Sequence, residues 1–373
     1  MSLAFNIDLT YNACLLSECP PDGAVQGTFC TLRDGARFTF TIMDRLTTLT
    51  LFVILAFVLD FLTGILAAPG VVATMIATRA MSPRKALILS TVATLIGPFL
   101  FGLAVANAVG VEVLNVRTVT PIVLYASMIS TIVWMVLTYY LRIPSSSSHA
   151  MIGGLLGAAL AVLGPAVIDA GGLLKMIASL ALTMPLGIAG GFLMVRLCYW
   201  LSQSASPKVN RRFNQGQLVA SFGLGLAIGS NSAQRVMGMM ALGLLATGFL
   251  PQFEIPTWVI AVSAIGLALG NLLGGMRMIN SVGGRFFQIR PIHGFSAETA
   301  SALIILVTSL LGGVVSTTQV TSLSVVGAGA GERVSMVRWD FVQSVVLTWV
   351  LTIPLTAILA AATCGVLKGL GVV

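Results

Sequence analysis

The chain has 373 residues, of which 57% are hydrophobic and only 9% are charged, whereas a soluble domain carries about 25% charged residues. This composition excludes a soluble globular protein and predicts an all-α polytopic membrane protein, because helices satisfy their own backbone hydrogen bonds in lipid. The net charge of +8 comes from basic residues scattered mainly near the ends of apolar runs, so we expect no nucleic-acid-binding face.

Residues 1–45 precede the first long apolar run, and we expect them to form an extracytoplasmic N-terminal extension. No basic start followed by an apolar stretch marks a cleavable signal peptide in this segment. The segment contains Cys14, Cys19 and Cys30, an odd set from which we predict no particular disulfide.

Apolar runs of membrane-spanning length follow along the chain. They lie at about residues 46–65, 86–109, 118–140, 173–197, 215–250, 255–276 and 341–367. Shorter apolar runs at 149–164, 297–311 and 321–326 do not comfortably cross ~30 Å of hydrocarbon at about 1.5 Å per residue. We therefore expect broken or re-entrant helices at these places, with about five crossings in each half of the chain.

The basic residues indicate the orientation in the membrane. With this number of crossings most of them fall on one side, among them Arg84, Lys85, Lys208 and Arg211. Because basic loops stay in the cytoplasm, we expect this side to be cytoplasmic and both termini to be extracytoplasmic, in a multi-pass protein of the cell membrane.

An internal repeat divides the chain into two halves. Four serines at 145–148 precede one short apolar run, and Ser316-Thr317-Thr318 precedes another about 170 residues later; the segment LTMPL at 182–186 is echoed by LTIPL at 351–355. We expect a first repeat at 46–203, a basic cytoplasmic linker at 204–215 and a second repeat at 216–373. Because each half crosses an odd number of times, the second repeat is inverted, as in many secondary transporters.

The hydroxyl clusters at the starts of the two short helices predict a binding site for an oxyanion. The first amides of a helix lack acceptors within it, and the peptide dipoles place about half a positive charge there. Hydroxyls and free amides together hold an anion without a buried lysine. The residues expected to bind it are Ser146, Ser147, Ser148, Ser316, Thr317 and Thr318. The alternative is that each cluster only caps its helix.

A second pair of features lies earlier in each half, where small and helix-breaking residues interrupt apolar runs. The first contains Gly64, Pro69 and Gly70, and the second contains Gly229 followed by Ser230, Asn231 and Ser232. Such residues can open a helix, so we expect freed carbonyls and the polar side chains of 230–232 to bind a cation or the anion. The alternative is a packing kink.

Five stretches resemble the inorganic phosphate transporter (Pit) family of secondary carriers. They read ATRAMSPRKALIL and PSSSSHAMIGGLLGAAL in the first half, and GFSAETASA, STTQV and LTWVLTIP in the second. The resemblance covers about residues 47–366. It implies an inverted-repeat carrier, a homodimer in the lipid bilayer, that moves inorganic phosphate together with Na⁺ or H⁺.

The chain departs from the signature segments of that family, which usually read Gly-x-Asn-Asp or Gly-Phe-His-Asp. Ala67 and Ser232 stand where the resemblance implies aspartates, Arg235 stands where a lysine is common, and Gln319 replaces the histidine that His149 retains in the other half. The anion cradle is therefore kept while acidic cation ligands are missing. We expect transport to depend less on Na⁺ than the resemblance implies, and coupling to run through protons or through Asp60.

Ionisable and polar residues inside apolar runs are candidates for coupling or gating, because a charge in the membrane is costly. They are Asp60, His149, Arg235, Glu298 and Gln319. The alternatives are an ion pair of Asp60 with Arg235, an ion pair of Glu298 with a cytoplasmic arginine, and a histidine that donates to a neighbouring carbonyl. We expect no cofactor, and the pattern identifies no metal site.

Two other functions compete with phosphate transport. Sulfate fits a site without aspartates, since sulfate carries no proton near neutrality that needs an acceptor. Ser148 and His149 could instead be the nucleophile and base of an intramembrane hydrolase, but adjacent residues rarely meet correctly and a third group is needed to orient the histidine. We therefore expect a transporter and not an enzyme.

Overall fold

The computed structural model describes residues 34–112, 119–141, 143, 145–204, 206, 208–282 and 287–370. The chain divides between Asp44 and Arg45 into two units, and the membrane-spanning segments belong to the second. The three cysteines of the expected N-terminal extension lie outside the described residues.

The described part of the chain is helical, without a strand. The first half contains α1 (Asp34–Ala77), α2 (Pro83–Leu100), the short α3 (Ala104–Asn107), α4 (Pro121–Leu141), α5 (Ser147–Leu163) and α6 (Ala170–Leu201). The second half contains α7 (Val209–Ala246), α8 (Thr257–Val282), α9 (Pro291–Leu310), α10 (Thr317–Glu332) and α11 (Trp339–Gly369). A π-helical turn at Ala108–Glu112 follows α3, and 3₁₀ turns at Pro165–Val167 and Val334–Met336 follow α5 and α10.

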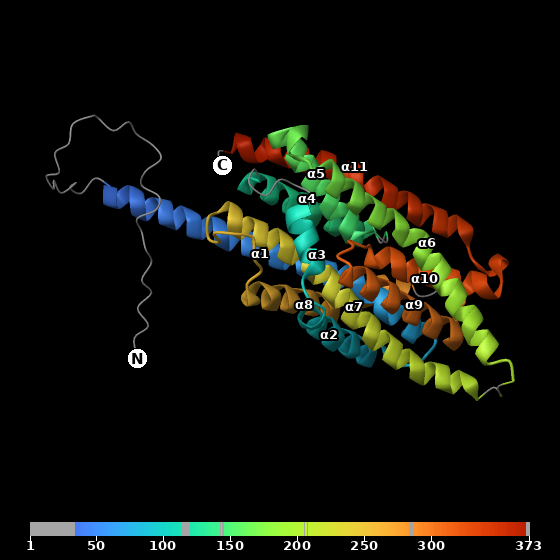
Figure 1. The fold of residues 1–373 in the computed structure, drawn as a ribbon. Coiled ribbons are helices and arrows are strands. Elements are labelled where there is room, and N and C mark those ends of the chain that lie inside the picture. Colours follow the sequence, from blue (N-terminus) through green and yellow to red (C-terminus); the bar gives the residue numbers. More distant parts are fainter. Residues whose placement is uncertain are drawn as a thin grey trace, which may run out of the picture. The chain divides into compact units, whose positions relative to one another are not determined.

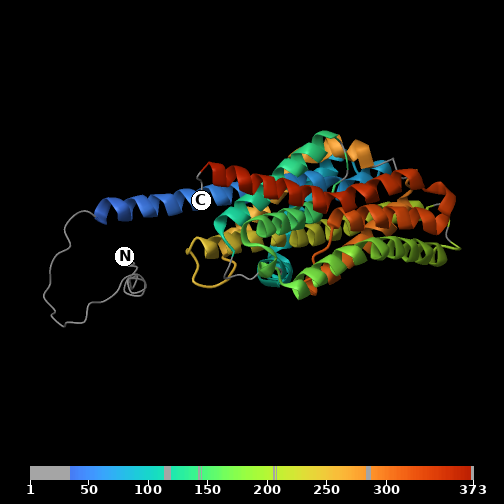
Figure 2. The same ribbon diagram turned by 90° about the horizontal axis from the view of Figure 1, so that it is seen from above.

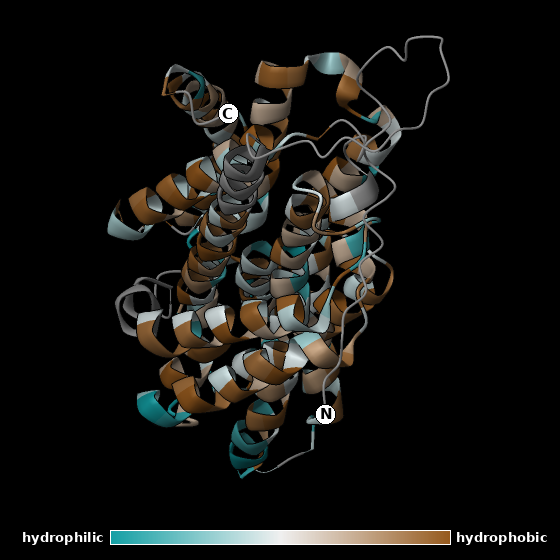
Figure 3. Cartoon of the chain, turned by 90° about the vertical axis from the view of Figure 1, so that its left-hand side faces the viewer, coloured by the Kyte–Doolittle hydropathy of each residue, from teal (hydrophilic) through white to brown (hydrophobic). Residues whose placement is uncertain are grey.

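Six of the described helices are long and apolar enough to cross a membrane, and a seventh candidate is the pair Pro83–Leu100 and Ala104–Gly110, which is bent by 69°. Hydrophobic residues make up most of the helices (Figure 3). Large apolar side chains such as Leu193 and Leu273 are 64% and 71% exposed, as expected of a surface that faces lipid. The expected all-α polytopic fold is confirmed.

The two halves pack in reciprocal fashion. In the first half α5 packs on α4, and in the second α10 packs on α9; across the halves, α5 packs on α11 and α10 packs on α6. Figure 1 shows that α6 and α11 run in opposite directions, as do α1 and α7. In the view from above, α11 again extends along the bundle (Figure 2). Five helices of each half are thus related by an inversion, with α3 as an addition to the first.

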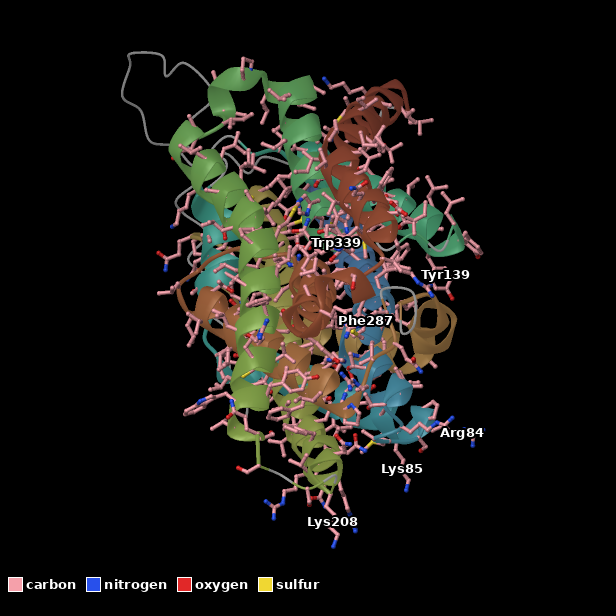
Figure 4. The ribbon with its side chains drawn as sticks, turned by 90° about the vertical axis from the view of Figure 1, so that its right-hand side faces the viewer. Arg84, Lys85, Tyr139, Lys208, Phe287 and Trp339 are labelled. Carbon is pink, nitrogen blue, oxygen red and sulfur yellow. The ribbon has the colours of Figure 1, made fainter. Side chains whose placement is uncertain are left out.

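The ends of several helices differ from the expected ones. The apolar run 297–311 belongs to α9, which covers Pro291–Leu310 and is long enough to cross the membrane, so the expectation of a re-entrant piece is wrong there. Helix α7 begins at Val209, inside the segment expected to be a linker. Lys208, which precedes it, lies at the same border of the molecule as Arg84 and Lys85 (Figure 4).

The expected helix breaks are also wrong, because α1 and α7 are continuous through them. The glycines allow close helix crossings instead. A Cβ added at Gly229 would lie 2.5 Å from the carbonyl oxygen of Thr94 in α2, and one at Gly64 would lie 2.1 Å from that of Leu267 in α8. Small residues at such crossings let backbones approach in membrane proteins. The backbone carbonyls therefore stay within the helices, except that Pro69 has no amide hydrogen to donate.

Candidate functional site

The N-termini of α5 and α10 meet inside the bundle. Ser146 and Ser316 are the N-cap residues of these helices, and each accepts a hydrogen bond from the amide three residues later, His149 N at 3.3 Å and Gln319 N at 3.4 Å. The two serine hydroxyls lie 2.8 Å apart and both are buried. Equivalent points of the two halves are therefore in direct contact, and two positive helix ends face one place.

Ser145 and Ser148 attach the start of α5 to its neighbours. The hydroxyl of Ser145 accepts a hydrogen bond from Trp134 Nε1 at 2.8 Å and lies 3.4 Å from that of Thr352 in α11. The hydroxyl of Ser148 donates to the carbonyl of Val315, just before α10, at 3.1 Å. Together with Ser146, three of the four consecutive serines thus contact residues of the other half.

The remaining serine, Ser147, lines a small cavity between α1, α5 and α7. The other residues that line it are Leu59, Thr63, Met151, Ser232, Arg235 and Val236. Its volume is about 10 Å³, which is room for about one water molecule. The cavity brings Ser147 of the first hydroxyl cluster together with Ser232 and Arg235, which belong to one signature segment of the second half. An apolar cluster that joins α1, α4, α5 and α7 surrounds this region.

Arg235 supplies the positive charge of the cavity. Its side chain is 2% exposed, Nη2 donates to Ser232 Oγ at 3.1 Å, and Nη1 has no hydrogen-bond partner among the described residues. The charge of Arg235 acts through space on Asp60 and on His149. The buried guanidinium therefore has N–H groups on Nη1 that donate to no described residue.

Asp60 lies fully buried in α1, one turn before Thr63. Neither carboxylate oxygen has a partner at bonding distance among the described residues, and the groups that act on its charge are the hydroxyl of Ser263 and the guanidinium of Arg235. Asp60 and Arg235 therefore interact through space, without the direct ion pair that was the alternative. A buried carboxylate without direct partners is costly, which favours a functional role.

The ring of His149 pairs with a serine of its own helix cap. Its Nδ1 lies 2.7 Å from Ser146 Oγ, so the partner is a hydroxyl and not the backbone carbonyl that was the alternative. The hydroxyl of Ser148 is directed to Val315. Ser148 and His149 therefore do not form the hydrogen bond that a nucleophile and its base require.

Glu298 belongs to a different polar network. Its carboxylate accepts hydrogen bonds from Thr74 in α1 and from Gln217 and Ser221 in α7, with Gln217 Nε2 at 2.8 Å. These are neutral donors, so the alternative of an ion pair with a cytoplasmic arginine is wrong. Thr74 lies fourteen positions after Asp60, which is about 21 Å along a helix, so Glu298 is not part of the cavity.

The other polar residues of the expected site point in different directions. Asn231 Nδ2 donates to Ser309 in α9 at 2.8 Å while its Oδ1 has no partner, and the hydroxyl of Ser230 accepts from Gln234 at 2.8 Å. In the first turn of α10, Thr317 is buried and Thr318 is half-buried. The amide group of Gln319 has no partner for either its oxygen or its nitrogen among the described residues.

Two sets of residues were not foreseen. Thr63 had a local signal, because it follows Asp60 by three positions and such residues share a helix face. The residues that bond to Glu298 had no such signal in the sequence, since Thr74 lies in α1 and Gln217 and Ser221 lie in α7, far from Glu298 in the sequence.

The chain is similar to known proteins over most of its length. The model of the Phosphate transporter family matches residues 64–360. A "Probable low-affinity inorganic phosphate transporter" of Rhizobium meliloti (strain 1021) is 36% identical over 81% of this chain and 91% of its own length, and a protein with the same description in Bacillus subtilis (strain 168) is 35% identical over 86% and 97%. A solved structure titled "The sodium-dependent phosphate transporter" matches 86% of this chain and 99% of its own with a TM-score of 0.81 and 22% identity, and thus has the same fold.

Proposed function

Because the chain belongs to the phosphate transporter family, whose model covers residues 64–360, we propose that it is a secondary active transporter that carries inorganic phosphate across the cell membrane. It is a transporter and not an enzyme, as are the relatives that it matches over most of their length. Within the molecule, the contact between Ser146 and Ser316 supports this proposal, because it brings the N-termini of α5 and α10 together.

The anion is held, in this proposal, between those two helix N-termini. Each end provides free amides and about half a positive charge, and the first residues of the helices, Ser147 and Thr317, add hydroxyl donors. Hydrogen bonds to a charged oxygen are shorter and stronger than those between neutral groups. Such a site holds a tetrahedral oxyanion in a low-dielectric environment where few charged side chains are present.

The size of the cavity limits how the anion enters. A volume of about 10 Å³ suits one water molecule and is too small for a tetrahedral oxyanion. Side chains that line it must therefore move before phosphate binds. Met151 and Arg235 are unbranched and long, and a methionine adapts its shape easily.

The coupling ion is H⁺ or Na⁺ in this proposal, and the carrier works as a homodimer with both termini outside the cell. Asp60 is the candidate for carrying the coupling proton, since it is the buried carboxylate nearest in sequence to the cavity-lining Leu59 and Thr63. The matched relatives are named for phosphate, which leaves the sulfate alternative without support.

Uptake into proteoliposomes tests this function. Purified protein should accumulate radioactive phosphate, and unlabelled phosphate should compete while sulfate should not. Ser147→Ala and Thr317→Ala should each lower phosphate uptake by about 10- to 100-fold, because a hydrogen bond to a charged group contributes about 1.5 to 3 kcal/mol. The matched controls Ser344→Ala and Thr348→Ala, whose hydroxyls bond within α11 at exposed positions, should transport normally. Normal uptake by both site variants would remove the hydroxyls of Ser147 and Thr317 from the anion site.

A further inference from the structure

Arg235 is a buried charge, and one of its two terminal nitrogens bonds to no described residue. A guanidinium has five N–H donors and never loses its proton in a protein; here Nη2 donates to Ser232, and Nη1 has no partner among the described residues. The side chain is 2% exposed and lines the cavity next to Ser147. Because buried polar groups are almost always bonded, the free donors indicate a ligand that accepts from them.

The surroundings of this guanidinium favour an anion. The other polar groups that line the cavity are the hydroxyls of Thr63, Ser147 and Ser232. The Thr63 hydroxyl donates to the carbonyl of Leu59 at 2.8 Å, so the neutral donors are Ser147 and Ser232. Ser147 is the first residue of α5, whose N-terminus adds positive potential. The nearby negative group is Asp60, which interacts with Arg235 through space and not by a direct bond. The cavity therefore presents positive charge and neutral donors to whatever enters it.

The same surroundings do not suit a second cation. A hard cation such as Na⁺ prefers anionic and carbonyl oxygens as ligands. In α7 the residue beside the guanidinium is Ser232, a neutral hydroxyl already bonded to it. The backbone carbonyls of α1 and α7 stay in continuous helices, except where Pro69 donates no hydrogen bond, and the described residues contain no group of three acidic, histidine or cysteine side chains that could hold a metal ion. A cation in this cavity would also be repelled by Arg235 and by the helix end.

We propose that Arg235 is the resident cation of the phosphate site, which pairs with the bound anion so that phosphate binding needs no Na⁺. The inference rests on the proposed function, because it names the group that neutralises the transported anion. A planar guanidinium donates two parallel hydrogen bonds to a tetrahedral oxyanion. Ser232 orients the guanidinium through Nη2 and leaves Nη1 free for the anion.

Binding of inorganic phosphate in the presence and absence of Na⁺ tests the proposal. The full chain is purified, and phosphate is titrated by calorimetry in sodium chloride and then in choline chloride at equal pH and ionic strength. The dissociation constants should agree within about twofold, and Arg235→Gln should weaken binding at least about tenfold in both salts. Arg290→Gln is the matched control, since Arg290 is half-exposed and pairs with Glu332; it should bind phosphate as the wild type does.

A reciprocal variant makes the test sharper. The double substitution Ser232→Asp with Arg235→Gln exchanges the fixed cation for a carboxylate, and it should bind phosphate only when Na⁺ is present. Wild-type binding that falls more than about tenfold in choline, or binding unaffected by Arg235→Gln, overturns the proposal while the phosphate function stands. Failure of the wild type to bind phosphate in either salt refutes the proposed function itself. If Arg235→Gln does not fold, the wild-type comparison and Arg235→Lys, which keeps the charge, decide.

Discussion

Replacing Ser146 and Ser316 by alanine, singly and together, measures the contact between the N-termini of α5 and α10. Ser146→Ala removes the cap on the amide of His149, the bond to the ring of His149 and the bond to Ser316. Ser316→Ala removes the cap on the amide of Gln319 and the same bond to Ser146. A cap contributes about 1 kcal/mol and a neutral hydrogen bond about 1 kcal/mol. The free energy of unfolding should therefore fall by about 3 kcal/mol in the first variant and about 2 kcal/mol in the second.

The double variant loses the shared hydrogen bond only once, so its loss should be smaller than the sum of the two single losses. The expected coupling is about 1 kcal/mol from the general value of a hydrogen bond, and about 0.6 kcal/mol from the average found between helices in membranes. We therefore expect a coupling energy between about 0.6 and 1 kcal/mol.

Reversible unfolding in mixed micelles, with increasing sodium dodecyl sulfate, gives the four free energies that the double-mutant cycle needs. A second cycle that pairs Ser146→Ala with Ser344→Ala is the control, since Ser344 is exposed and bonds within α11, and its losses should add. A coupling below about 0.3 kcal/mol between Ser146 and Ser316, which is the scatter of independent sites, would show that the two hydroxyls do not touch. The opposed arrangement of the two helix N-termini would then be wrong.

Three further substitutions test separate parts of the structure. Gly191→Ala places a Cβ 2.1 Å from a backbone carbonyl oxygen of α10 and should destabilise the protein by about 1 to 3 kcal/mol. Its control is Gly223→Ala in α7, where an added Cβ meets nothing within 4 Å; this variant should be neutral or stabilising by up to about 1 kcal/mol. Equal melting temperatures for the two variants would contradict the close crossing of α6 and α10. Asp60→Asn should abolish phosphate accumulation driven by a pH gradient while phosphate exchange across the membrane continues, and accumulation at the wild-type rate would remove Asp60 from the coupling mechanism. Glu298→Ala leaves three buried donors without an acceptor and should lower the free energy of unfolding by at least about 3 kcal/mol. Glu298→Gln should lose less, because its amide oxygen still accepts hydrogen bonds. Equal losses in the two variants would show that these bonds do not form.

The sequence by itself determined the fold class and the starts of the two short helices. Hydropathy belongs to each run of residues, and a run of about 20 apolar residues has few stable arrangements other than a membrane helix. Capping is equally local, since Ser146 and Ser316 each accept from an amide only three residues away. The spacing of the two hydroxyl clusters also indicated that the chain consists of two related halves before any contact was known. The roles of the site residues in binding and coupling stay predictions.

Only the tertiary structure decided what the polar and small residues contact. Gly229 looked like a helix break in the sequence, but α2 crosses α7 at this point and a glycine is needed for the close approach. For Glu298 the sequence left an ion pair open as the alternative, yet Gln217 and Ser221 of α7 and Thr74 of α1 surround it with neutral donors. Each outcome depends on which helices lie side by side, and packing between segments separated by many residues leaves no periodic signal in either segment. A pattern along one helix therefore predicts which residue types are exceptional, while the neighbouring helices determine what those residues do.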